Sequence, residues 1–349
     1  MHYFGKESTL TVRDGTEIIA RAALRNNSVA EEVVLPASVK YIDDFAFAGS
    51  AVGKINLENV DYIDGNAFEG CAQLTSVTLT AEVVYSKAFL NCTGLEEIKL
   101  DGTKFINSNV FQGCISLTSV TVPASVIALK AEAFKDCTRL ETAEVNVGNL
   151  NGTVSSSGTA GNGWFKGCTS LKSVTFADGL LRLENYLFEG CTSLTTIKLP
   201  ATLQRLSAGY GAFKNCTSLV SLTIPAGVTA IENNEFVGCA SLKEIIFEGS
   251  VTKIGNASFD GCAALDTIDL SQVNSVGNNA FRGCAALEYV NLPQAATLGA
   301  NSFESCSALK EASIPKVAKI SNYAFSNCGK LVSVSAAAAT EAGVFAFFG

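Results

Sequence analysis

Histidine is the residue that this sequence most nearly lacks, since His2 is the only one among 349 residues. Histidine is the general base of most nucleophilic triads and the commonest protein ligand of catalytic metals. A single histidine beside the first residue therefore excludes triads and histidine-based metal centres. Paired carboxylates remain at Asp43-Asp44 and Glu31-Glu32, but adjacent acids on a protein surface are usually only solvated. We expect no catalytic residues, no metal and no cofactor.

Basic residues and long apolar runs are scarce as well. The 25 lysines and arginines are outnumbered by 33 aspartates and glutamates, which gives a formal charge of -8. A nucleic-acid-binding protein needs a basic face to displace counterions, so this balance argues against nucleic acid as a partner. No run of about 18 apolar residues is present, so we expect no direct insertion into a membrane. Residues 1–10 show no secretion signal, because no basic start precedes an apolar stretch.

What the sequence does contain is one pattern repeated along most of its length. The pattern is marked by fourteen phenylalanines that recur at steps of 21–25 residues, apart from one step of 31. They are Phe47, Phe68, Phe89, Phe111, Phe134, Phe165, Phe188, Phe213, Phe236, Phe259, Phe281, Phe303, Phe325 and Phe347. A fixed period in the low twenties is typical of a solenoid, in which each repeat is one turn stacked on the next.

Each repeat predicts two short extended segments. In the twelve complete repeats from Phe68 to Phe325, a Leu follows the Phe by six residues, and mostly Val, Ile or Leu follow it by nine and eleven, as in Val290 and Leu292. This alternation predicts a short strand with one buried face. The six prolines come twelve residues after the Phe position, where they indicate the strand's end, because proline lacks a ladder donor. A second apolar pair before each Phe, such as Val39 and Ile42, predicts an extended segment on the opposite side of the coil.

The residues around each Phe predict about one helical turn, as in Asn279-Ala280-Phe281. The residue before each repeat cysteine is Gly, Asn, Asp or Ser. Glycine, asparagine and aspartate tolerate a positive φ, so we expect a left-handed residue to end the turn at this position.

The twelve cysteines occur once per repeat, three residues after the Phe. Equivalent residues of stacked parallel strands point the same way about 4.8 Å apart. A disulfide needs converging bonds and Cβ atoms about 3.5–4.5 Å apart, and a zinc site would need pairs such as Cys-x-x-Cys. We therefore predict free thiols that fill the core as small apolar groups.

The repeat resembles the BspA-type leucine-rich repeats of bacterial surface proteins over about residues 18 to 349. The residues that carry the resemblance are Ala280-Phe281, Cys284, Leu287, Val290, Leu292, Pro293 and their equivalents. The fold class predicted is an α/β repeat protein, a right-handed leucine-rich-repeat solenoid of about 13–15 repeats. Short parallel strands would form one face, with short helical turns and extended segments elsewhere.

The predicted organisation is a single solenoid over residues 1–349. An Asp-Gly turn between two alternating stretches predicts an N-terminal capping hairpin at 1–20. The repeats occupy 21–349, with a Gly- and Ser-rich loop insertion at 148–163 and a partial repeat at 342–349. The partial repeat is explained either by a chain cut inside a longer array, which we favour, or by an unusual cap built from Phe345, Phe347 and Phe348.

The outward positions of the predicted strands are the candidate binding surface. They lie eight and ten residues after each Phe, and fourteen of the 24 are Ser or Thr. Only Tyr289 and Ile246 are bulky, and tyrosine is among the residues that dominate protein interfaces. The hypothesised partner-binding patch consists of Glu244, Ile246, Asp269, Tyr289 and Asn291.

Trp164, the only tryptophan, follows the predicted insertion. It is a partner-binding candidate as a lid over a site formed by the insertion. The alternative, which we favour, is a plug that packs the insertion onto the coil.

The function predicted is a non-catalytic protein-interaction module. The resemblance implies a bacterial cell-surface or secreted protein, its signal or anchor removed, that adheres to host matrix or plasma proteins such as fibronectin or fibrinogen. The alternative is a structural spacer that projects another domain from the cell surface. Glycan binding and the oligomeric state stay open.

Overall fold

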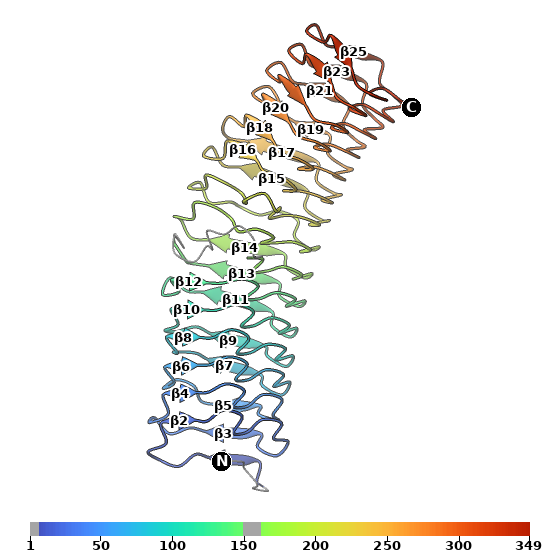
Figure 1. Ribbon diagram of the computed structural model, residues 1–349. Coiled ribbons are helices and arrows are strands. Elements are labelled where there is room, and N and C mark those ends of the chain that lie inside the picture. The colour runs from blue at the N-terminus through green and yellow to red at the C-terminus, as the bar shows by residue number, and fades with distance from the viewer. Residues whose placement is uncertain (1–6, 149–161) are drawn as a thin grey trace. The chain divides into compact units, whose positions relative to one another are not determined.

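The computed structural model describes residues 7–148 and 162–349 and consists of two units, Met1–Ala177 and Asp178–Gly349 (Figure 1). Each unit is a stack of turns whose strands form two parallel ladders, which we call the first and the second ladder. The predicted insertion at 148–163 falls almost entirely on residues 149–161, which lie outside the described residues.

The first unit contains both ladders, and every hydrogen-bonded pair of strands in it is parallel; its first ladder is divided into three sheets. Its first ladder comprises β1 (Thr9–Thr11), β3 (Glu32–Val34), β5 (Lys54–Ile55), β7 (Ser76–Thr78), β9 (Glu97–Lys99), β11 (Ser119–Val122), β13 (Thr142–Val145) and β14 (Ser173–Phe176). Its second ladder is one six-stranded sheet of β2 (Ile18–Ile19), β4 (Tyr41–Ile42), β6 (Tyr62–Ile63), β8 (Val83–Val84), β10 (Phe105–Ile106) and β12 (Ala128–Leu129). Figure 1 shows the two rows of arrows in this unit.

The second unit repeats this arrangement. Its first ladder comprises β15 (Ser221–Ile224), β17 (Glu244–Phe247), β19 (Thr267–Ile268), β21 (Tyr289–Asn291), β23 (Glu311–Ser313) and β25 (Ser333–Ser335). Its second ladder comprises β16 (Ala230–Ile231), β18 (Lys253–Ile254), β20 (Ser275–Val276), β22 (Thr297–Leu298), β24 (Lys319–Ile320) and β26 (Glu341–Ala342). The short parallel strands and the extended segments predicted from the apolar alternation are confirmed.

The predicted helical turns are wrong, because the described residues contain no helix. The turn around Phe68 shows the physical reason. Cys71 donates its N–H three residues back to Phe68 O at 3.1 Å, whereas Phe68 and Gly70 donate theirs to the next repeat, to Ala88 O at 2.7 Å and Leu90 O at 2.8 Å. A helix directs every N–H along its own axis, so a turn that shares its donors with the next repeat cannot be helical.

Two left-handed residues per turn produce this backbone path. The predicted one, directly before the cysteine, is confirmed in all twelve repeats, with φ between 57° and 77°. The second lies two residues before the Phe, as at Asn66 (φ 57°) and Asn279 (φ 56°), and we did not predict it. The asparagines at this position could have indicated a left-handed residue, since asparagine adopts that region of φ and ψ more readily than most residues.

The predicted capping hairpin at 1–20 is also wrong. Strand β1 pairs in parallel with β3, and β2 pairs in parallel with β4, so the two strands belong to different ladders. The Asp-Gly turn is present, with Gly15 at φ 82° and Thr16 N–H donating to Arg13 O at 3.2 Å. It connects the two ladders, and hydrogen bonds to the next repeat outweigh the local preference for a hairpin.

The core of each unit is a column of stacked phenylalanine rings. Successive ring centroids lie 4.9–5.8 Å apart from Phe47 to Phe165 in the first unit and 5.1–5.7 Å apart from Phe188 to Phe347 in the second. Except for Phe347, which is 46% exposed, these rings are buried. Dispersion and the loss of apolar surface to water therefore bind each turn to the next.

All twelve cysteines are free and buried beside this column, as their spacing predicts. They are more than apolar fillers, because their thiols donate hydrogen bonds across repeats. Cys71 Sγ, for example, donates to Phe47 O at 3.0 Å, and equivalent bonds along the chain measure 3.0–3.3 Å. Each such bond connects one turn to the turn before it.

Candidate interaction surface

All five residues of the predicted patch are exposed on the first ladder of the second unit. Glu244 and Ile246 lie on β17, Asp269 directly follows β19, and Tyr289 and Asn291 lie on β21. The exposed fraction is 46% for Ile246 and 59% for Tyr289. Strand alternation explains this orientation, since successive residues point to opposite faces of a sheet.

The register places these residues on three consecutive repeats. Glu244 pairs with Thr267 and Ile245 with Ile268, so Ile246 is level with Asp269 on the neighbouring strand. The following repeat, which carries Tyr289 and Asn291, bonds to its predecessor through Ala286 N–H and Ala263 O at 3.0 Å. The structure therefore brings the five residues onto one face, as the sequence predicts; their role in binding stays a prediction.

Trp164 does not join them. It belongs to the first unit, is only 2% exposed, and occupies the position before Phe165 where most repeats carry a small residue. Its carbonyl accepts from Phe134 N–H at 2.9 Å, while its indole Nε1–H has no partner among the described residues. A lid requires accessibility, so this burial argues against the lid. The plug stays a prediction, because the insertion that it would pack lies outside the described residues.

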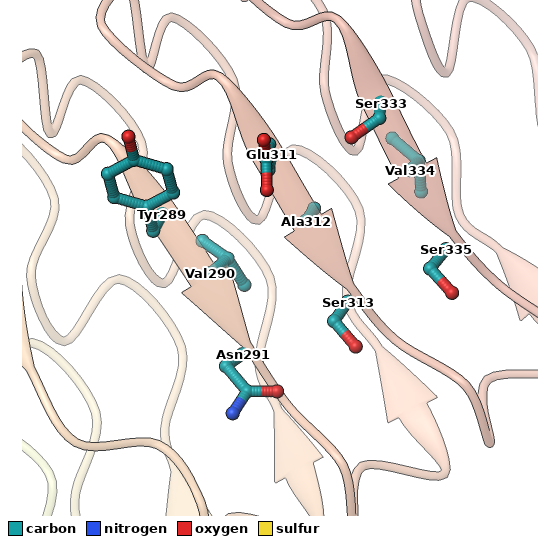
Figure 2. A pocket seen from close by; sticks show the side chains of 9 residues that line it. All are labelled: Tyr289, Val290, Asn291, Glu311, Ala312, Ser313, Ser333, Val334 and Ser335. Carbon is teal, nitrogen blue, oxygen red and sulfur yellow. The ribbon is translucent and has the colours of Figure 1, made fainter.

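A shallow hollow of about 370 Å³ lies over β21, β23 and β25 (Figure 2). Its lining consists of Tyr289, Val290, Asn291, Glu311, Ala312, Ser313, Ser333, Val334 and Ser335. The hollow exists because the side chains beside Tyr289 on the two following strands are mostly small (Figure 2). The sequence analysis did not predict this hollow, because it considered the outward positions singly. Small residues at the equivalent positions of the two repeats after bulky Tyr289 were the signal that could have revealed it.

An ion pair borders this hollow. Lys310 Nζ lies 2.7 Å from Glu288 Oε2 and 5.7 Å from the centroid of the Tyr289 ring. The hydrogen bond that Lys310 donates to Glu288 raises the pKa of Lys310, so the ammonium stays charged and is held beside the ring. A cation within about 6 Å of an aromatic face is attracted by the ring's quadrupole. The ion pair thus keeps a cation close to the Tyr289 ring.

Burial raises the pKa of several thiols and of one carboxyl in the core. Burial raises the pKa of the Cys71 thiol to about 11 and of the Cys137 thiol to about 12, so neither is a thiolate at neutral pH. Burial also raises the pKa of Glu235 to about 7, but this carboxyl is fully buried and cannot reach a substrate. Residues 7–148 and 162–349 contain no group of three or more His, Cys, Asp or Glu side chains arranged to hold a metal ion.

The two ladders, the inward leucine and phenylalanine columns and the regular repeat period define a leucine-rich-repeat solenoid of about 14 turns. The model of the BspA-type leucine-rich-repeat region matches residues 17–141, 154–262 and 207–332. The chain belongs to the BspA-type leucine-rich-repeat family.

Solved bacterial structures share this fold. A leucine-rich repeat protein from Bacteroides ovatus is 24% identical with a TM-score of 0.63, over 90% of this chain and 89% of that one. A leucine-rich cell surface protein from Faecalibacterium prausnitzii is 24% identical with a TM-score of 0.50, over 96% and 89%. A leucine-rich repeat protein from Eubacterium ventriosum is 19% identical with a TM-score of 0.50, over 99% and 91%. At these identities the likeness establishes the fold alone.

The search of curated proteins finds no match to the chain. In the described part of the molecule, no helix has the length and hydropathy that crossing a membrane requires.

Proposed function

We propose that this chain is a non-catalytic module of a bacterial cell-surface or secreted protein, and that it binds a protein partner through the first ladder of its second unit. Leucine-rich-repeat proteins generally mediate protein–protein interactions, and BspA-type members are typically bacterial surface proteins. The observation that carries the choice of face is Tyr289, which is 59% exposed beside the hollow over β21, β23 and β25.

The binding site consists of the hollow and the residues before it. Tyr289 and Ile246 supply the apolar area, and Glu244, Asp269 and Asn291 supply a polar border. An aromatic anchor surrounded by polar groups is the usual composition of an interface hot spot. Adhesion to a host matrix or plasma protein is the role that suits a surface protein with such a site.

The test uses purified fibronectin and fibrinogen as probes, with binding to the immobilised chain measured by biolayer interferometry. We expect Tyr289→Ala to weaken binding by at least tenfold, because truncating a hot-spot tyrosine removes about 2 kcal/mol or more. Ile246→Ala should weaken it less. Thr121→Ala, exposed on the first ladder of the first unit, is the matched control and should change nothing.

Two outcomes would contradict the proposal. Undiminished binding by the Tyr289→Ala and Ile246→Ala chains would remove this patch from the interface. Failure of the unaltered chain to bind either probe would contradict adhesion to these proteins and favour the structural spacer.

A further inference from the structure

The second ladder of the first unit carries an exposed apolar stripe. The first residues of five consecutive strands are in register: Ile18 pairs with Tyr41, Tyr41 with Tyr62, Tyr62 with Val83, and Val83 with Phe105. We call these five residues the tyrosine stripe. Ile18 is 55% and Tyr62 37% exposed, and the other three are half-buried.

Exposed side chains next to the stripe enlarge it. Tyr85, directly after β8, is 40% exposed, and Ile127, directly before β12, is 55% exposed. The rings of Tyr41 and Tyr62 lie 6.2 Å apart between centroids, tilted by 37°. Single exposed apolar residues need no explanation, but a continuous patch of them on one face marks an interaction site.

Four aspartates lie at or near these strands, and one of them contacts the Tyr41 hydroxyl. Tyr41 donates its hydroxyl hydrogen to Asp64 Oδ2 at 2.6 Å, and this bond, burial and the nearby Asp43 raise the pKa of Tyr41. Asp44 follows β4 by two residues, and Asp61 directly precedes β6. The described ion pairs include none of these four aspartates.

The basic residues beside the stripe cancel only part of this charge. Lys104 is paired with Glu82 at 3.1 Å, whereas Lys40 Nζ donates to the neutral carbonyl of Asn59 at 3.0 Å and keeps its positive charge. The four aspartates outnumber this one unpaired lysine. The face thus combines tyrosine rings with carboxylates that have no cationic partner among the described ion pairs.

The equivalent positions of the second unit show that the repeat itself does not require this stripe. There the first residues of the second-ladder strands are mostly polar or charged: Ala230, Lys253, Ser275, Thr297, Lys319 and Glu341. A side chain needed for stacking would be apolar in both units. The tyrosine stripe is therefore apolar surface that the repeat itself does not require.

We propose that the tyrosine stripe binds a segment of another protein in which arginine or lysine side chains alternate with apolar ones. Tyrosine rings attract guanidinium and ammonium groups through cation–π contacts, and the neighbouring carboxylates accept charge-assisted hydrogen bonds from them. The apolar side chains of the segment cover Ile18, Val83 and Phe105. A second copy of this chain is a poor occupant, because it would bring aspartates against aspartates.

The test titrates the full chain with two synthetic peptides, (Arg-Val)4 and (Glu-Val)4, by isothermal titration calorimetry at physiological ionic strength. We expect the unaltered chain to bind (Arg-Val)4 at least tenfold more tightly than (Glu-Val)4. Tyr62→Ser should weaken binding of (Arg-Val)4 at least fivefold. Tyr323→Ser is the matched control, since Tyr323 is a tyrosine of the second unit with the same exposed fraction as Tyr62, 37%, and it should leave the affinity unchanged.

The control separates a specific site from attraction between any acidic protein and any basic peptide. Equal losses in the Tyr62→Ser and Tyr323→Ser chains, equal affinities for the two peptides, or no binding of (Arg-Val)4 would each overturn the proposal. A dimer in sedimentation analysis that Tyr62→Ser dissociates would also overturn it and assign the stripe to a second copy. Ile18→Ser, at the more exposed end of the stripe, replaces Tyr62→Ser if circular dichroism shows that variant to be unfolded.

Discussion

The second ladders of the two units carry the same kind of residue at their inward positions and different kinds at their outward positions. Ile42 and Ile63 of the first unit and Ile231 and Ile254 of the second are all at most 1% exposed. One residue earlier in each strand, the first unit carries tyrosine, and the second carries Ala230 and Lys253. The repeat thus requires only that the inward residues be apolar. The outward residues of either unit are free to vary and to serve binding.

The phenylalanine columns should contribute equally to the stability of the two units. Phe89 lies 4.9 and 5.5 Å from its neighbouring rings, and Phe259 lies 5.2 Å from both of its own. We expect Phe89→Ala and Phe259→Ala each to lower the free energy of unfolding by roughly 3–5 kcal/mol, through lost burial and the cavity left behind. Urea unfolding followed by circular dichroism measures both. A loss at one site less than half of that at the other would show that the two interiors are not equivalent.

A buried carboxyl should give the second unit a pH response of its own. Glu235 stands where other repeats carry a small residue such as Ala67, and it accepts hydrogen bonds from Ser207 Oγ at 2.5 Å and Ala212 N–H at 3.0 Å. Burial raises its pKa from 4.5 to about 7, against the lowering effect of these two bonds. The folded state therefore holds this proton more tightly than the unfolded chain does.

The sign of the effect follows from that difference. Stability contributed by Glu235 is fully present below about pH 4.5 and is lost as the pH rises to about 7, by roughly 3 kcal/mol. Urea unfolding at pH 5 and pH 8 should therefore show Glu235→Gln gaining stability relative to the unaltered chain at the higher pH. Glu244→Gln, at an exposed position on β17, is the control. A Glu235→Gln chain with the unaltered pH dependence would contradict the assignment.

The cysteine hydrogen bonds should give the smallest of these effects. Cys92 Sγ donates to Phe68 O at 3.0 Å, and Cys262 Sγ to Phe236 O at 3.2 Å. The Phe68 carbonyl also accepts the Cys71 N–H, so removing the thiol leaves it bonded. We expect Cys92→Ala and Cys262→Ala each to lower the free energy of unfolding by about 1–2 kcal/mol. A loss at either site as large as that of the phenylalanine variants would mean that the thiol carries more of the contact between turns than the shared carbonyl implies.

Local patterns predicted what depends on local geometry. Alternation identified the strands and the outward direction of Tyr289, and residue type identified the left-handed position at Gly70 and its equivalents. The helical turns and the hairpin at 1–20 were wrong for a common reason. Each was inferred from preferences within one repeat, whereas hydrogen bonds to the next repeat decide the path of the backbone.

The candidate site divides in the same way. The exposure of Ile246 and Tyr289 could be predicted, because a single strand determines which side chains point outward. The hollow beside Tyr289 could not, because its lining comes from three strands whose residues become neighbours only through the register. The burial of Glu235 likewise depends on Ser207 and Ala212, which belong to the preceding repeat.

By itself, the sequence determined the period, the inward columns and the family, because each inward position must be filled with an apolar side chain of suitable size in every repeat. Only the tertiary structure decided which outward residues meet. The tyrosine stripe consists of side chains from successive repeats that become neighbours when Ile18, Tyr41 and Tyr62 align in register. That register depends on backbone hydrogen bonds between repeats, which no single repeat encodes.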